Sequence, residues 1–462
     1  MTKTTRPLAA VAQIVILLAV SFASTQALAE VSAEEAARLG KDLTPMGAEM
    51  AGNADGSIPA WSGKWLGAPP GITHAGNSSH YQDPYSDEKP LFTITAANVE
   101  QYRDKLSDGQ LALFKRYPDS FRMPVFPSHR DFRFPERVEG NIAANAINAT
   151  LVSDGYGVKG AVGASPFPIP KNGYELMWNL ILPARPTREE AVYKMVLTLS
   201  NGNQVFESVD YKILNVWDIP GQTPESIEGR HAYALLTTLE PARKKGEIIL
   251  SQTFINPILQ PAQSWQYVPG TRRVRRAPTI AYDTPRGAGG FRVVDEDRLF
   301  NGAPDRYEWK LLGKRELFIP YNNYALDQPG VSVAQLTRTR GHLDPQYMRY
   351  EPHRVWVLEA TLKPGARHIY ARRVIYIDED SWIGVMADNY DGKGLLWRSN
   401  MQTTQYAYDA QSFQARVALF HDLISGAYLA DRLVNDSAPA KLNASTFEAD
   451  DFTPANLRKL GR

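Results

Sequence analysis

The chain has 462 residues, with 51 lysines and arginines against 50 aspartates and glutamates, and 43% of its residues are hydrophobic. This balance is typical of a globular protein and excludes a disordered chain. The formal charge of +1 gives no long-range field that would attract DNA or RNA. Cysteine is absent, which excludes disulfides, thiolate catalysis, cysteine-ligated metal sites and a lipid-modified N-terminal cysteine.

The first residues have the pattern of a secretory signal peptide. Lys3 and Arg6 precede an apolar run from Leu8 to Val20, and Ala27-Leu28-Ala29 is a small-x-small cleavage site before Glu30. The run is shorter than the ~20 residues of a transmembrane helix, so cleavage is expected rather than a membrane anchor. Residues 1–29 are therefore predicted to be removed. An exported protein of this size without cysteine indicates the bacterial periplasm.

Residues 30–170 are predicted to form loops and short helices that pack around the rest of the protein. Ser32 with Glu35, and Ser107 with Gln110, have capping-box spacing, and a third helix is expected from Glu136 to Leu151. Stretches rich in proline and aromatic residues separate these helices. Linkers seldom contain so many aromatic residues, so we expect the loops to lie on a folded domain.

Residues 171–431 are predicted to form an antiparallel β domain, because apolar and polar residues alternate along many short segments. The segments 205–213, 248–254 and 413–419 show the alternation clearly, and turns such as Asn201-Gly202 and Asp391-Gly392 separate the segments. Roughly ten strands with short connections predict a mainly β fold, a large curved half-open antiparallel β-barrel. A polar C-terminal tail follows at 432–462.

One glycine motif has dinucleotide-binding spacing but the wrong context. Gly155-x-Gly157-x-x-Gly160 is followed almost at once by Pro166, Pro168 and Pro170. The nucleotide-binding turn needs a helix after the glycines, and a helix cannot continue through these prolines. A glycine loop is the expected structure.

Two acidic segments are candidates for a cation site. Asp378-Glu379-Asp380 and Asp388-Asn389-Tyr390-Asp391 could bind a divalent cation between two turns, but solvated hairpin tips explain the same residues and are preferred. In the segments His342-Leu343-Asp344 and 349–353, acids adjoin histidines, and structural hydrogen bonds are expected there. Zinc-helix, nucleophile-elbow and Walker patterns are missing from the sequence. No metal, cofactor or catalytic residue is predicted.

An arginine-rich segment is the clearest candidate for a binding site. Trp265 and Tyr267 share one face of a predicted strand. Arg273 and Arg275 share a face farther along, with Arg272, Val274 and Arg276 on the other. Four arginines this close repel one another unless each meets an anion or a carbonyl. They either hold the anionic end of an amphipathic ligand or an acidic partner, or they pair with acids such as Asp295, Glu296 and Asp297.

The aromatic content suggests a second, diffuse feature. The chain has 9 tryptophans, 22 tyrosines and 17 phenylalanines. A curved sheet with more aromatic residues than its core needs can line an elongated apolar cavity, although aromatic residues also simply fill cores. The predicted ligand-binding residues are Trp265, Tyr267, Arg273, Arg275, Phe254 and Trp356.

Several blocks along the chain, in order, resemble a family of unknown function, DUF1329. They include residues 43–49, 51–56, 58–61, 117–118, 128–130, 167–170, 265–276, 313–316, 319–322 and 373–382. The resemblance covers essentially the whole chain after the signal peptide. The family looks distantly similar to the lipoprotein-localisation (Lol) carrier and receptor fold, a half-open antiparallel barrel with a helical plug that binds acyl chains in its cavity.

This resemblance implies a periplasmic carrier for a hydrophobic or amphipathic, lipid-like molecule. Family members are found beside resistance-nodulation-division (RND) type exporters and an outer-membrane partner family, so such an exporter is the implied partner. The alternatives are a ligand-free accessory protein that docks on an exporter or channel, and an enzyme that acts on a lipid-like substrate. The Lol receptor is anchored through a cysteine, which this chain lacks, so delivery by a diffusing or partner-bound protein is expected.

Overall fold

The computed structural model describes residues 1–2, 31–76, 79–277 and 282–461. Its largest element is a 16-stranded sheet. The strands of that sheet are β1 (Phe92–Ile94), β2 (Met123–Val125), β5 (Arg188–Thr198), β6 (Gln204–Leu214), β7 (Arg230–Glu240), β8 (Ile248–Phe254), β9 (Gln263–Val268), β10 (Arg273–Arg276), β13 (Tyr307–Pro320), β14 (Tyr350–Leu362), β15 (Arg372–Asp378), β16 (Gly384–Tyr390), β17 (Leu396–Ala407), β18 (Ser412–Asp422), β19 (Tyr428–Leu433) and β20 (Lys441–Leu442). Two small ribbons pair β3 (Thr150–Val152) with β4 (Gly157–Lys159), and β11 (Pro285–Arg286) with β12 (Arg292–Val293).

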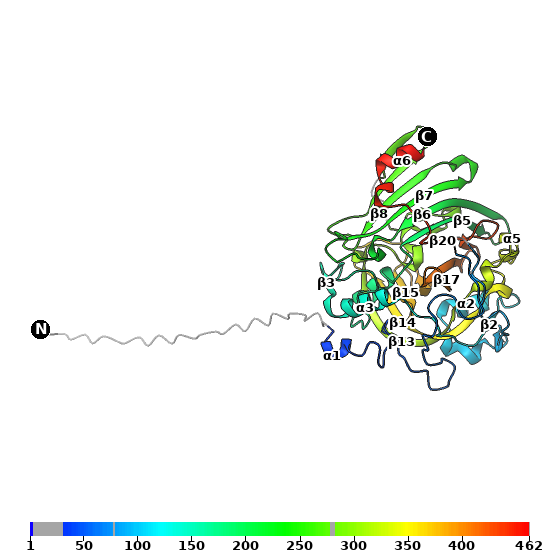
Figure 1. Ribbon diagram of the computed structural model, residues 1–462, viewed down its shortest axis with the longest axis horizontal. Helices are drawn as coiled ribbons and strands as arrows, with labels where there is room; N and C mark the ends of the chain where they lie inside the picture. The colour runs from blue at the N-terminus through cyan, green and yellow to red at the C-terminus, as the bar shows by residue number, and fades with distance from the viewer. Residues whose placement is uncertain (3–30, 77–78, 278–281, 462) are drawn as a thin grey trace.

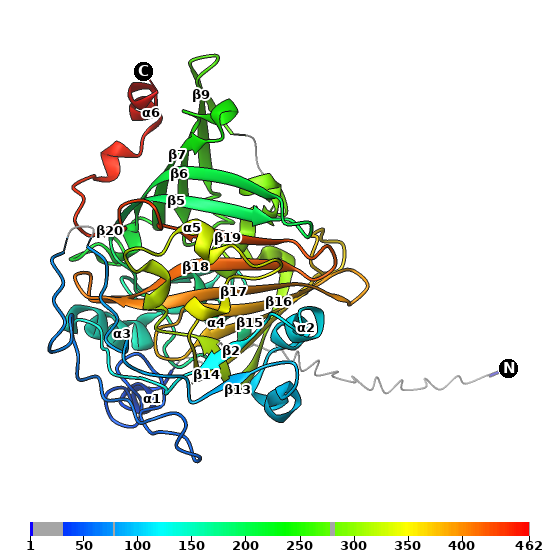
Figure 2. The ribbon, with the colours of Figure 1, turned by 90° about the vertical axis from the view of Figure 1, so that its right-hand side faces the viewer.

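The sheet follows one path, β1-β2-β14-β15-β16-β17-β18-β19-β5-β6-β7-β8-β9-β10, with β13 added to β14 and β20 to β5. It curves strongly without closing (Figures 1 and 2). Among the described strands the pairing is antiparallel except between β2 and β14. The prediction of a large, curved, half-open antiparallel sheet is therefore confirmed. The strand count is higher than predicted, because the β domain itself has more strands than expected and because β1, β2 and β20 come from the N-terminal region and the C-terminal tail.

Short helices surround the sheet. The α-helices are α1 (Ala33–Ala36), α2 (Asp108–Arg116), α3 (Glu136–Asn148), α4 (Gly173–Ile181), α5 (Val333–Leu336) and α6 (Pro454–Leu460). The 3-10 turns are η1 (Val99–Lys105), η2 (Val216–Asp218), η3 (Ala242–Lys244), η4 (Ala288–Gly290), η5 (Val294–Leu299), η6 (Pro304–Arg306), η7 (Tyr324–Asp327), η8 (Pro345–Tyr347) and η9 (Ala449–Asp451). Both predicted capping boxes are present, at Ser32 and Ser107.

The remaining local predictions are mostly confirmed. The third helix begins at Glu136 as expected, but it ends at Asn148 because β3 starts at Thr150. The glycine motif forms the turn before β4, β4 itself and the residue after it, and no nucleotide-binding helix. The predicted signal peptide lies outside the described residues. Among the residues that are described, no helix has the length and apolarity needed to cross a membrane.

The sheet divides the apolar core into two parts. The main core lies inside the curve, where the buried helix α4 contacts β13 and β14. A second, smaller core lies on the opposite face of β7, β8 and β9, where Phe452 and Leu457 of the tail cover Tyr233, Leu250 and Tyr267. In Figure 1 the red helix α6 lies beside these green strands. One face of the β7–β9 extension is thus closed by the C-terminal tail.

Candidate functional site

Two of the predicted ligand residues, Trp265 and Tyr267, lie under the C-terminal tail. Both belong to β9 and point toward the second core. The Tyr267 hydroxyl donates a hydrogen bond to the carbonyl of Gly461, and the Tyr267 side chain is 5% exposed. These aromatic residues therefore hold α6 against the sheet.

Arg273 and Arg275 lie on the opposite face, at the exposed edge strand β10. They pair with Val268 and Gln266 of β9, so they share one face as the alternation predicts. Both are exposed. Neither forms an ion pair with another described residue, so the predicted cross-strand pairing with acids is wrong.

Those acids have other partners. Asp295 binds Arg373 at 2.7 Å, and Glu296 lies 3.7 Å from Arg398. For Asp297, burial would raise the carboxyl pKa, but several nearby arginines, Arg292 first among them, together outweigh it and the pKa is lowered. The exposed arginines of β10 are thus left without an acidic partner among the described residues.

The last two predicted residues lie elsewhere. Phe254 is half-buried at the end of β8, opposite Arg230. Trp356 belongs to β14, where it stacks on Trp382 and carries the Lys314 ammonium over its ring at 4.7 Å. The structure therefore does not bring the six predicted residues into one site. Arg273 and Arg275 are the pair that it keeps together on an accessible surface.

A continuous row of side chains connects these arginines with the main core. Each member faces the next across a strand pair, on the side of the sheet away from α6. This inner-face row consists of Ala191, Tyr211, Leu236, Ile249, Gln266 and Arg275. Neighbouring strands lie about 4.8 Å apart, so six strands span roughly 24 Å.

The polarity of the inner-face row changes along its length. Ala191 is buried in the main core, whereas Leu236 and Ile249 in the middle are only half-buried. Gln266 and Arg275 make the outer end polar and charged. An amphipathic surface of this kind offers apolar area in the middle and a cationic rim.

A small pocket lies at the β5 end of this face. Its free space is about 20 Å³, roughly the room for one or two water molecules. Its polar lining consists of Arg185, Glu189, Arg298, Gln402 and Gln414. Glu189 lies on the same face of β5 as Ala191, two residues away, so the pocket adjoins the inner-face row.

Arg185 is the unusual residue of this pocket. Its backbone N–H donates to Asp218, but its guanidinium group forms no ion pair or hydrogen bond with any described residue. Gln414 is 5% exposed, and both polar atoms of its side chain also lack a partner there. Buried polar groups are nearly always hydrogen-bonded, so unpaired groups around a cavity mark a place where a ligand or water fits.

The charges around Arg185 set its protonation and that of a nearby histidine. Burial and, to a smaller extent, the neighbouring Arg298 lower the pKa of Arg185 to about 9, against the opposite effect of Asp218 and Asp297. Burial likewise lowers the pKa of His231 to about 3, with Arg185 and Arg298 adding to the effect. His231 is therefore neutral at pH 7, and Arg185 stays positively charged.

Neither of the two best-defined cavities in the described part of the chain is the elongated apolar cavity expected from the aromatic content. A second cavity, beside Phe121 and His342, holds only about 10 Å³. Neither it nor the Arg185 pocket could enclose an acyl chain. Many aromatic residues, among them Trp178 and Trp217, are fully buried and fill the core instead. An apolar ligand would have to lie along the open inner face.

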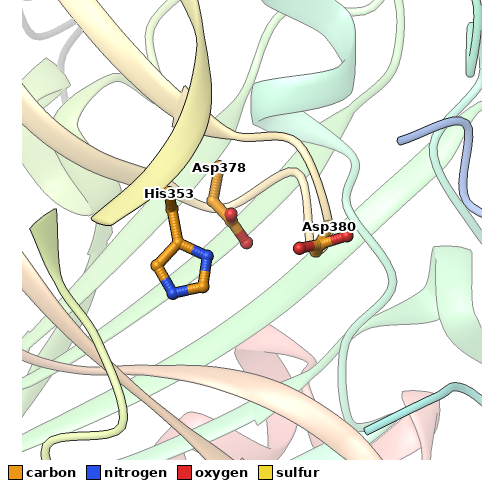
Figure 3. A group of neighbouring side chains, drawn as sticks. All are labelled: His353, Asp378 and Asp380. Atoms are coloured by element: carbon orange, nitrogen blue, oxygen red, sulfur yellow. The ribbon is translucent and has the colours of Figure 1, made fainter. Parts of the chain in front are cut away.

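A cluster of buried titratable groups lies where β14 and the β15–β16 turn meet (Figure 3). One atom from each of His353, Asp378 and Asp380 lies within 4.8 Å of the others. The prediction of solvated tips is wrong for this turn, since Asp378 is 0% and Glu379 1% exposed.

Cationic side chains from distant segments neutralise this cluster. Arg130 contacts Asp380 with Nε–Oδ2 and Nη2–Oδ1 distances of 2.8 Å, and Lys314 Nζ lies 2.7 Å from Glu379. Burial would raise the pKa of Asp380, but Arg130 outweighs it and the pKa is lowered. His353 Nε2 is 3.1 Å from a Glu351 carboxylate oxygen. Asp378 accepts through Oδ2 from the Tyr321 hydroxyl and from Ser381, while its Oδ1 has no partner among the described residues. Asp380 and Glu379 are paired with cations, so the cluster serves as an internal ion network.

The second acidic segment is also buried. Asp388 accepts hydrogen bonds from the Gly109 N–H and the Tyr376 hydroxyl. Burial raises the pKa of Asp388 to about 7. The histidine at 342 bonds Ser120 and the Leu343 carbonyl, as the prediction of a structural role required.

Arg185 and Gln414 were missed by the sequence reasoning. Arg185 stands between Pro183 and Pro186, in a segment that reads as a loop. Gln414 alternates with apolar residues in a strand, which predicts a polar outer face. Only the folded chain brings both residues to the same pocket.

The sequence also matches a known family. Residues 93–458 match the family model named protein of unknown function DUF1329. An uncharacterised protein of Pseudomonas aeruginosa is 43% identical over 453 residues, covering 96% of this chain and 97% of its own. The chain therefore belongs to the DUF1329 family, which confirms the resemblance.

Three solved structures are similar at lower levels. A DUF1329 family protein from Desulfovibrio piger has 15% identity and a TM-score of 0.40 over 59% of this chain and 92% of its own. A candidate outer membrane lipoprotein-sorting protein domain from Vibrio parahaemolyticus has 16% identity and a TM-score of 0.40 over 59% and 91%. A LolA superfamily protein from Nitrosomonas europaea has 14% identity and a TM-score of 0.35 over 62% and 98%.

Proposed function

We propose that this protein binds a hydrophobic or amphipathic, lipid-like molecule on its inner face and carries it through the periplasm. The observation that carries the proposal is the half-buried middle of the inner-face row, Leu236 and Ile249, on a sheet whose other face is covered by α6. A ligand lying on these side chains would gain roughly 25 cal/mol for each Å² of apolar surface that it buries.

The exposed arginines of β10 fit the same role. Arg273 and Arg275 stand at the outer end of the inner-face row and have no acidic partner among the described residues. We assign them the task of attracting an anionic amphiphile, or the acidic surface of a partner, toward this face. Such attraction acts mainly on the association rate and weakens as salt is added.

An open face suits a carrier that must release its cargo to another protein. The family resemblance implies an RND-type exporter and an outer-membrane partner as the source or destination of that cargo. A ligand-free protein that docks on an exporter would use the same half-buried face as its contact surface. An enzyme would need, in addition, an acid–base pair beside the bound ligand. A measurement of ligand binding distinguishes these two functions, because a carrier binds a lipid-like molecule and a ligand-free docking protein does not.

The test uses N-phenyl-1-naphthylamine, an uncharged probe that fluoresces when it enters an apolar site. The wild-type protein should enhance its fluorescence saturably, and the double substitution Leu236→Glu with Ile249→Glu should abolish the enhancement. The control is Phe206→Glu, because Phe206 is a 48%-exposed residue of β6 on the opposite face. No enhancement by the wild type, or equal enhancement by the double variant, would refute the proposal.

A further inference from the structure

The unpaired guanidinium of Arg185 needs an explanation that the fold does not supply. Arg185 is half-buried, and a charge withdrawn from water normally pairs with an opposite charge or a full set of hydrogen bonds, because leaving water is costly. Elsewhere in this interior the rule holds, as in the pairs Arg373–Asp295 and Arg416–Asp327, both at 2.7 Å. Arg185 differs from these arginines because it faces free space.

The neighbours of Arg185 do not compensate its charge. Arg298 reaches Glu189 at 3.6 Å and adds a second positive charge to the pocket. Asp218 and Asp297 act on Arg185 from farther away, and neither forms an ion pair with it. Burial raises the pKa of Asp218 to about 7, so near neutral pH a part of that acid is uncharged.

The other lining groups suit an anion with a short apolar attachment. The Gln414 amide is buried and unpartnered, so its N–H groups are available to an acceptor. Leu180, Ile383 and Phe413 supply apolar walls. The free space of about 20 Å³ admits a group of only a few atoms. A carboxylate is small enough, and it matches the planar fork of an arginine.

We propose that the Arg185 pocket binds the carboxylate of an amphipathic ligand whose apolar chain lies along the inner-face row. This inference rests on the proposed function and assigns a head group to the cargo. Arg185 and Gln414 would donate N–H hydrogen bonds to the carboxylate, and Leu236 and Ile249 would contact the chain. Arg273 and Arg275 of β10 would then attract the ligand first, and Arg185 would bind its carboxylate.

The experiment compares dodecanoate with dodecanol, which share a chain length but differ in charge, by displacement of N-phenyl-1-naphthylamine. Charge-assisted hydrogen bonds are among the stronger ones, so the wild type should bind dodecanoate at least about tenfold more tightly than dodecanol. Arg185→Gln should remove this preference and leave dodecanol binding unchanged. The control variant Arg243→Gln, which removes one exposed charge from η3, should retain the preference for dodecanoate.

Stability provides an independent readout. Because Arg185 has no partner among the described residues, Arg185→Gln should not lower the melting temperature of the ligand-free protein. A structural role would predict a clear fall. If Arg185→Gln does not fold, Gln414→Leu tests the same site, and it should weaken dodecanoate binding several-fold while sparing dodecanol.

The outcomes separate the two proposals. Equal binding of dodecanoate and dodecanol by the wild type, or a preference that survives Arg185→Gln and Gln414→Leu, would overturn the head-group assignment but leave the carrier intact. A preference lost only in the Arg273→Gln, Arg275→Gln variant would also overturn it, because the head group would then lie at the rim. Failure of the wild type to bind either compound or the probe would refute the carrier itself.

Discussion

Arg130 and Asp380 are 250 residues apart in the chain, yet they form a two-pronged ion pair in the buried interior. Arg130 also donates to the carbonyls of Pro59 and Glu49. One guanidinium thus ties the N-terminal loops to the turn between β15 and β16. The N-terminal region is held on the sheet by a charged contact that is itself inaccessible to solvent.

Removing this arginine should be costly. Arg130→Ala leaves Asp380 buried without its paired cation, and breaking one side of a buried pair typically costs about 3–5 kcal/mol. Urea denaturation should show a loss of this order. The matched control is Arg103→Ala, whose partner Glu100 is exposed and whose loss should cost less than about 1 kcal/mol. Equal effects of the two substitutions would contradict this account.

The buried carboxyl of Asp388 should make stability depend on pH. Its pKa is raised to about 7 by burial, so the folded protein keeps a proton that the unfolded chain releases near pH 4. The stability from this group is complete below pH 4 and is lost as the pH rises through 7. Asp388→Asn should therefore leave the free energy of unfolding unchanged at pH 4 and raise it by more than about 1 kcal/mol at pH 8. A variant that is less stable than the wild type at pH 8 would contradict the assignment.

The second core should depend on Leu457 of α6. This side chain is 0% exposed, whereas Leu460 on the same helix is 52% exposed. Leu457→Ala should weaken the docking of α6 by about 2 kcal/mol or more and speed proteolysis of the C-terminal tail. Leu460→Ala should leave the rate near that of the wild type. If both variants are cleaved alike, the helix does not depend on this buried contact.

The N-terminal residues give a prediction about export. Cleavage after Ala29 should leave Glu30 as the first residue of the periplasmic protein. N-terminal sequencing of that protein would show it directly. Recovery of Met1 would show that the signal is retained.

The sequence predicted local structure better than long-range contacts. The capping boxes at Ser32 and Ser107, and the alternation around Tyr211, depend on neighbouring residues, so they could be read directly. The burial of Asp380 could not, because its environment depends on Arg130, which is distant in the chain. Acids in a hairpin turn are usually solvated, and only the folded N-terminal region changes that.

The candidate site shows the same limit. The shared face of Arg273 and Arg275 followed from strand periodicity. The position of Trp265 and Tyr267 beneath α6 could not be predicted from periodicity, because the tail packs there only in the folded chain. Arg185 became visible as a site residue only when its lack of partners could be seen.

The central claim is that the inner face carries a lipid-like molecule, and native mass spectrometry of protein purified from periplasm without detergent tests it most directly. We predict that the wild type carries a bound small molecule that organic solvent removes, and that the Leu236→Glu, Ile249→Glu variant carries none. Wild-type protein that shows only the mass of its polypeptide, or a variant that retains the same bound molecule, would contradict the account.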